Sequence, residues 1–151
     1  MEKVETFAVI DGCELKIDLI LVEYISPILF TCIDQFNHMW IVSVYRHNAT
    51  SIGGLIARTT SEKVIQLLSN QISIRDIFIN DDGFVYTVNL TENKNNIEIE
   101  QWHVDNIAPN ILPSPNIFMD ADEGEFAEEL AILNERTFDS ILTMIGETSL
   151  L

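Results

Sequence analysis

The chain has 151 residues, of which 47% are apolar and 21% are charged, a composition typical of a folded domain rather than of a disordered chain. Its 24 acidic side chains outnumber its 8 basic side chains, so the formal net charge at pH 7 is −16. This balance argues against direct binding to nucleic acid or to an anionic membrane, because both need clustered Lys and Arg. It favours a basic protein surface as the partner, although a charge of this size can also serve solubility alone.

The first two thirds of the chain predict an antiparallel sheet. Runs rich in Val, Ile, Leu and aromatic residues alternate with short polar turns, as in a meander of strands. We expect about six strands, at 14–25, 28–33, 38–47, 55–58, 84–88 and 97–104. Pro27 is expected to end the first strand, and 48–54 is expected to be a loop. Its Gly53-Gly54 pair is interpreted as hairpin or bulge glycines rather than as a phosphate cradle. A second polar turn is predicted over 91–96.

Two short helices are predicted between the fourth and fifth strands. Thr59-Thr60-Ser61-Glu62 matches a capping box with Thr59 as the N-cap residue. The apolar spacing that follows predicts a helix that ends near Asn70. Ser73 is expected to cap a second short helix over 74–79.

The C-terminal part predicts a connection followed by one long helix. Three prolines within 105–116 exclude a helix interior or a central strand there, so 105–119 is expected to be a Pro-rich connection. A helix is predicted over 120–147, with Glu125 as the alternative start because Gly124 weakens the first turn. Its apolar face consists of Phe126, Leu130, Leu133, Thr137, Ile141 and Met144. The expected fold is a single α+β domain, residues 1–151, with a sheet-rich body over 1–104.

The few residues able to carry out chemistry are interpreted as structural. His38, His47 and His103 fall in strand-like segments and lack metal-ligand spacing. The pair Arg75-Asp76 is expected to be a structural ion pair, and Asp120–Glu125 lacks the Gly and Glu positions of a calcium loop. We therefore expect no enzyme activity, no metal and no cofactor.

The expected location is the cytoplasm. Cys13 and Cys32 are the only cysteines, and their apolar surroundings predict reduced core thiols, with a disulfide between them left open. The first residues lack the basic and apolar pattern of a signal peptide, and the apolar runs are too short to span a bilayer.

Part of the chain resembles a known but uncharacterised family of small bacterial and phage domains. The resemblance covers Ile25–Ile79 and depends on Pro27, Leu29 and Phe30, then on Trp40-Ile41-Val42, and then on Ile72-Ser73-Ile74-Arg75-Asp76 and Phe78. The pair Asn70-Gln71 departs from the turn expected in that family. The resemblance implies an α+β fold and a bacterial or phage origin, and it implies no activity.

The C-terminal third carries the functional expectation. From Gln101 to the end there are ten acidic residues and one basic residue, Arg136. The residues predicted to bind a partner are Asp120, Asp122, Glu123, Glu125, Glu128 and Glu129. We expect a non-catalytic, protein-binding inhibitor, immunity protein or antitoxin of a bacterial or phage conflict system. Its carboxylates would cover a basic surface, such as that of a nucleic-acid-binding enzyme, by imitating phosphates. The alternative is a structural or adaptor subunit that assembles through the apolar face of the C-terminal helix, with itself or with another chain.

Overall fold

The computed structural model describes residues 6–91 and 97–149, with side chains up to Asp139. Within these residues seven antiparallel strands pair in chain order: β1 (Thr6–Ile10), β2 (Cys13–Tyr24), β3 (Ser26–Ile33), β4 (Met39–His47), β5 (Ser51–Thr59), β6 (Phe84–Thr91) and β7 (Ile97–His103). The helices are α1 (Ser61–Leu68), α2 (Ala127–Ser149) and the short 3-10 helices η1 (Asp76–Phe78) and η2 (Val104–Asn106). The predicted α+β class is confirmed, although the sheet has one strand more than expected.

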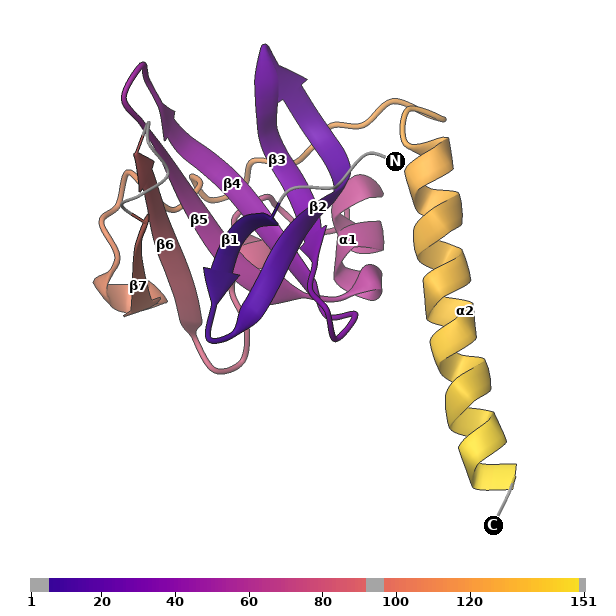
Figure 1. The fold of residues 1–151 in the computed structure, drawn as a ribbon. Helices are drawn as coiled ribbons and strands as arrows, with labels where there is room; N and C mark the ends of the chain where they lie inside the picture. Colours follow the sequence, from indigo (N-terminus) through magenta and orange to yellow (C-terminus); the bar gives the residue numbers. More distant parts are fainter. Residues whose placement is uncertain (1–5, 92–96, 150–151) are drawn as a thin grey trace.

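The sheet curls until it is nearly barrel-shaped, so each of its faces has its own core (Figure 1). The inner core contains Phe30, Trp40 and Val42, and the ring of Phe7 on β1 meets Phe30 edge-on at 5.2 Å between centroids. Tyr86 on β6 donates a hydrogen bond of 3.2 Å to Asp11 in the β1–β2 turn, which links the two sides of the curl. The outer core lies under α1, η1 and the chain between β7 and α2.

Three features of the strands differ from the prediction. β1 was not expected. Pro27 lies inside β3, where it pairs with Glu23 of β2 before the β4 pairing begins at Leu29, so its missing N–H group breaks no β3–β4 hydrogen bond. The Gly53-Gly54 pair lies inside β5 rather than in a loop, opposite a bulge in β4 at Tyr45. A β carbon on Gly53 would lie 2.8 Å from the Tyr45 ring, so any other residue there would require the ring to move. The predicted turn over 91–96 lies mostly outside the described residues.

The N-cap of α1 is Thr60, not Thr59. The Thr60 hydroxyl accepts a hydrogen bond of 3.2 Å from the Lys63 amide, whereas Thr59 is the last residue of β5 and is buried. The helix ends near Asn70 as predicted. In place of the predicted second helix there is only the 3-10 helix η1. The Ser73 hydroxyl accepts a hydrogen bond of 3.1 Å from the Asp76 backbone amide.

The Pro-rich connection is part of the core rather than a free spacer. Ile107 and Leu112 are buried in it. α2 begins at Ala127, later than either predicted start, after Gly124 at a φ of 82°, which a helix interior does not allow. Leu133 of α2 is fully buried between the helix and the body, so the first half of the predicted apolar face packs on the protein's own body.

Arg136 makes the next contact of α2 with the body after Leu133. Arg136 donates two hydrogen bonds to the Asp18 carboxylate on β2, at 2.7 and 2.9 Å. The C-terminal half of the helix then extends past the sheet (Figure 1). Ile141 and Met144 of the predicted apolar face lie outside the described side chains. No helix within the described residues is long and apolar enough to cross a membrane.

Candidate functional site

The predicted partner-binding residues lie in one stretch, residues 120–129, which we call the acidic segment. It contains six carboxylates and no basic residue. Only Glu128 and Glu129 lie in the first turn of α2, where the helix dipole favours anions. The others precede the helix, in a turn in which the Glu125 amide donates to the Asp122 carbonyl. Four of the six acids therefore lie before the helix rather than in its first turn.

The body of the protein holds the beginning of the acidic segment in place. The side-chain amide of Asn70 donates to the Ala121 carbonyl at 3.2 Å and accepts from the Ala121 amide at 3.0 Å. The Ile74 amide also donates to the Ile117 carbonyl at 2.8 Å. The backbone of the acidic segment is therefore fixed against the α1–η1 region, which holds the first acids in a set place on the surface.

Asn70 can make this contact because of how α1 ends. Asn70 has a φ of 61°, a left-handed conformation that Asn tolerates better than most residues. The backbone amide of Asn70 donates to the Leu67 carbonyl, and the backbone amide of Gln71 donates to the Gln66 carbonyl. Together these two hydrogen bonds form a Schellman motif. Asn70 is not among the predicted site residues, although an Asn directly after a helix is a recognisable C-terminal signal.

Five of the six acids are exposed: Asp120, Asp122, Glu123, Glu125 and Glu128. Glu129 is different, because it is half-buried and its Oε2 atom is enclosed without a hydrogen-bond partner. Because Phe126, Leu130 and Leu133 define the apolar face of the helix, Glu129 is expected to be exposed like Asp122, Glu123, Glu125 and Glu128, and this expectation is wrong for Glu129. The remaining five present their carboxylates to the outside.

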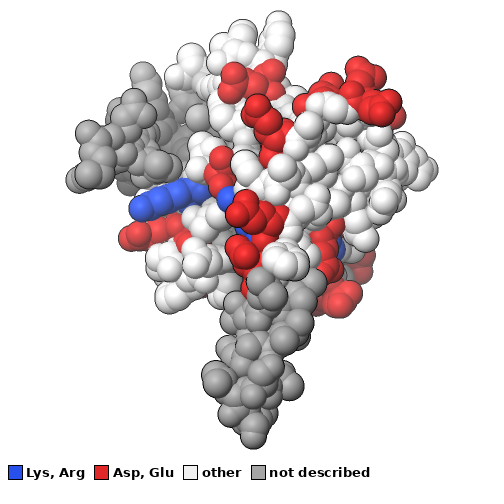
Figure 2. All heavy atoms as spheres, turned by 90° about the vertical axis from the view of Figure 1, so that its right-hand side faces the viewer, with Lys and Arg blue, Asp and Glu red and all other residues white. Residues whose placement is uncertain are grey.

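Several basic side chains are held elsewhere in the fold. Arg136 is bound to Asp18 on β2, Lys63 donates to the Ile79 carbonyl and to Asn80, and the Arg58 guanidinium lies 5.0 Å from the centre of the Trp40 ring. Figure 2 shows the face that carries α2, on which acidic side chains form several separate groups with few basic ones among them. The acidic charge of this face is thus largely uncompensated.

Asp34 is the most tightly held carboxylate among the described residues. Burial alone would raise its pKa, but hydrogen bonds from the Trp40 indole at 3.0 Å, the His38 and Phe36 amides and the Cys13 thiol hold the pKa below its ordinary value. His38 lies 3.7 Å from the same carboxylate. The Asp34 carboxylate therefore lies close to both a thiol and an imidazole, and its hydrogen bonds connect the β3–β4 turn to the inner core.

The surroundings of the two thiols do not favour a cysteine nucleophile. A catalytic thiol needs a neighbouring base that lowers its pKa. Burial, followed by the hydrogen bond to Asp34, raises the pKa of Cys13, and burial raises the pKa of Cys32 to about 12. Both cysteines are free thiols, which settles the disulfide left open above. At neutral pH both carry their proton.

The other polar residues singled out in the sequence have structural contacts. His47 lies at the end of β4, where its Nδ1 atom is 3.0 Å from the Ser26 hydroxyl, and His103 ends β7 beside Asp105. The expected Arg75–Asp76 ion pair is replaced by other partners. Arg75 donates to the Pro113 carbonyl at 3.5 Å, and Asp76 accepts from the Ser73 amide. The described residues contain no group of three or more His, Cys, Asp or Glu side chains able to hold a metal.

A family of unknown function, DUF6575, matches residues 12–139. The chain belongs to this family. The match confirms the predicted membership of an uncharacterised family, and it extends well beyond the 25–79 region that carried the resemblance. The DUF6575 region runs from the β1–β2 turn into α2 and includes Asn70 and the whole acidic segment. Neither curated proteins nor solved structures give a match to the chain.

Proposed function

We propose that this member of the DUF6575 family is a non-catalytic binding module that docks its acidic segment on a positively charged surface of another protein. The observation that carries the proposal is the combination of five exposed carboxylates, no basic residue within the segment, and a backbone anchor on the body through Asn70. Charges held in a fixed arrangement lose less conformational entropy on binding than charges on a free tail.

The sharpest form of the proposal is an inhibitor, immunity protein or antitoxin. A protein surface that binds nucleic acid carries Lys and Arg placed to neutralise closely spaced phosphates. Exposed carboxylates of the acidic segment offer such a surface a similar density of negative charge. The net charge of −16 also speeds the encounter with a basic partner at low salt. Covering this surface would block the partner's own access to nucleic acid.

Two variants with equal charge test the proposal. The first neutralises the exposed acids of the segment: Asp120→Asn, Asp122→Asn, Glu123→Gln, Glu125→Gln and Glu128→Gln. The control neutralises five exposed acids on other elements: Glu14→Gln, Glu23→Gln, Glu62→Gln, Asp81→Asn and Glu98→Gln. Both variants have a formal net charge of −11 instead of −16. Asn suits position 120 because Asp120 has a φ of 51°.

The readout is capture from an extract of the native host, analysed by mass spectrometry. The wild-type chain and the control variant are expected to retain the same basic protein, and the segment variant is expected to lose it. Retention of that protein by the segment variant would rule out the acidic segment as the binding site. Circular dichroism of all three chains checks that each is folded. Surface substitutions of this kind change stability by less than about 0.5 kcal/mol each.

One observation favours the adaptor function as a second candidate. On α2 the side chain of Phe138 is 59% exposed and that of Ile132 is 40% exposed, and the helix continues past the body (Figure 1). The other exposed acids are spread over many elements, which fits a charge that serves solubility. Sedimentation of the wild-type chain and of Phe138→Ser tests this candidate. Self-assembly through α2 predicts that the wild-type chain sediments as a dimer or a larger assembly and that Phe138→Ser dissociates it. A wild-type chain that sediments as a monomer would exclude self-assembly.

A further inference from the structure

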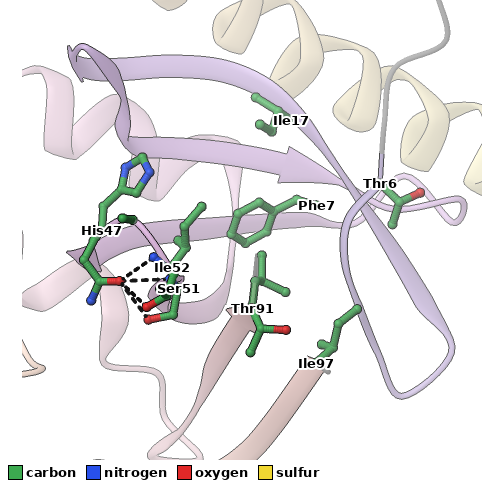
Figure 3. Close-up of a pocket in the computed structure, with 12 residues that line it drawn as sticks. Thr6, Phe7, Ile17, His47, Ser51, Ile52, Thr91 and Ile97 are labelled. Carbon is green, nitrogen blue, oxygen red and sulfur yellow. Dashed lines mark hydrogen bonds between the residues drawn. The ribbon is translucent and has the colours of Figure 1, made fainter. Parts of the chain in front are cut away.

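A cleft of about 380 Å³ opens at one end of the curled sheet, and none of its lining residues belongs to the acidic segment (Figure 3). Its walls come from the start of β1, the middle of β2, the β4–β5 turn, the end of β6 and the start of β7. The Phe7 ring lies in the middle of these walls and rests on Phe30 of the inner core. The β carbon that Gly54 lacks would lie 3.7 Å from this ring. The cleft is therefore the open end of the barrel-like interior, with Phe7 as its floor.

The lining of the cleft differs in chemistry from the rest of the protein. Its apolar residues are Phe7, Ile17, Ala49, Ile52, Leu90 and Ile97, and its polar residues are Thr6, His47, Asn48, Thr50, Ser51 and Thr91. None of these described lining residues is Asp, Glu, Lys or Arg, in a chain whose residues are 21% charged. The described walls therefore offer apolar contact and hydrogen-bonding groups, without a carboxylate, an ammonium or a guanidinium group.

Hydrogen bonds fix the walls in advance. The Asn48 side-chain oxygen accepts from the amides of Thr50 and Ser51, both at 2.9 Å, and from their hydroxyls, as Figure 3 shows. The Ser26 hydroxyl and His47 Nδ1, 3.0 Å apart, join the β2–β3 hairpin to the end of β4. A cleft with a preformed shape binds a ligand at a low ordering cost.

One large apolar side chain of the cleft wall is about half exposed to solvent. Ile97 is 47% exposed and lines the cleft itself. Removal of such surface from water favours the occupied cleft.

We propose that this cleft binds a small uncharged molecule with an apolar body and a hydrogen-bonding group at one end. The volume is at the lower end of the range of about 300–1,000 Å³ that ligand pockets have, and the mouth of a barrel is a common place for them. Among the described lining residues, an anion would meet neither Lys nor Arg in a chain of net charge −16, and a cation would meet no carboxylate. The site shares no residue with the acidic segment, so it is independent of the proposed docking function.

The probe for this site is N-phenyl-1-naphthylamine, a neutral apolar fluorophore whose emission rises in apolar surroundings. The full chain is expected to bind it saturably with one site. Its anionic relative 1-anilinonaphthalene-8-sulfonate, which adds a sulfonate to the same ring system, is expected to bind more weakly. The absence of saturable binding of the neutral probe, or tighter binding of the sulfonate, would overturn the proposal.

Substitutions of Ile97 locate the site. Ile97→Trp fills the cleft and is expected to weaken probe binding about tenfold or more, and Ile97→Ser removes apolar wall without adding bulk and is expected to weaken it less. The control is Ile79→Trp, because Ile79 is 38% exposed and lies after η1, outside the cleft. The charge-neutralised segment variant should bind the probe as the wild type does. Equal effects of Ile97→Trp and Ile79→Trp would show that the probe binds elsewhere and contradict the proposal.

Discussion

Replacement of Asn70 separates the two roles of this residue at the end of α1. Asn70→Gly keeps the left-handed conformation, which glycine adopts freely, and removes both hydrogen bonds to Ala121. Asn70→Ala removes the same hydrogen bonds and also forces a side chain with no compensating contact into a φ of 61°. The difference in stability between Asn70→Ala and Asn70→Gly therefore reports the left-handed backbone conformation, and hydrogen exchange at Ala121 in Asn70→Gly reports the anchor of the acidic segment.

The expected magnitudes follow from these contacts. A neutral hydrogen bond contributes about 0.5–1.5 kcal/mol net, and both bonds are exposed, so together they contribute about 1 kcal/mol. Glycine offsets most of this loss because it relieves the left-handed strain, so Asn70→Gly should change the free energy of unfolding by less than about 1 kcal/mol. Asn70→Ala should cost about 2 kcal/mol, which lowers Tm by about 4–8 °C for a domain of this size.

Hydrogen exchange at the Ala121 amide is the decisive assay. This amide donates to Asn70 in the wild-type chain, so its exchange should be about fivefold faster in both variants, consistent with a loss of about 1 kcal/mol in local stability. Urea unfolding supplies the global stability for comparison. Unchanged exchange at Ala121 in Asn70→Gly would refute the idea that Asn70 fixes the acidic segment, whatever happens to global stability.

Three further predictions concern the body of the protein. Asp34→Asn should destabilise the fold by about 1–3 kcal/mol at neutral pH. The folded pKa of Asp34 lies below its ordinary value of 3.8, so its contribution to stability is present above that pH and is lost as the pH falls through the folded pKa. Urea unfolding at strongly acidic pH should therefore show little difference between the variant and the wild type. Iodoacetamide at neutral pH should label Cys13 slowly and Cys32 only after unfolding, since the raised pKa of each thiol keeps it protonated; rapid labelling of Cys13 would contradict the contact with Asp34. A double-mutant cycle of Arg136→Ala and Asp18→Ala should give a coupling of about 1 kcal/mol, and a coupling near zero would mean that this pair does not anchor α2.

The sequence predicts the sheet well where local patterns are sufficient. The strands at 38–47 and 97–104 match β4 and β7 to within a residue at each end, because β-branched and aromatic residues alternate there and polar turns flank them. The Gly53-Gly54 pair predicts a loop from local pattern alone, whereas in β5 the Tyr45 ring packs over Gly53. That contact between neighbouring strands has no signature in the residues around the glycines.

The candidate site was predicted in part. The acidic stretch is visible in the sequence, and the first half of the apolar face of α2 was identified correctly through Leu133. The anchor could not be predicted, because Asn70 and Ala121 lie 51 positions apart and meet only once α1 and the chain before α2 pack together. The cleft was missed for the same reason. Its walls come from strands distributed between Thr6 and Ile97, and only the curl of the sheet brings them together.

Association kinetics with the captured partner test the central claim most directly. The association rate constant and the dissociation constant are measured for the wild-type chain and the two charge-matched variants at low and at physiological salt. Docking through the acidic segment predicts that the segment variant loses about tenfold or more in affinity and most of its salt dependence, while the control variant, with the same charge of −11, keeps both close to wild type. Equal losses in the two variants would show that only the net charge matters and would contradict the assignment of the acidic segment as the docking site.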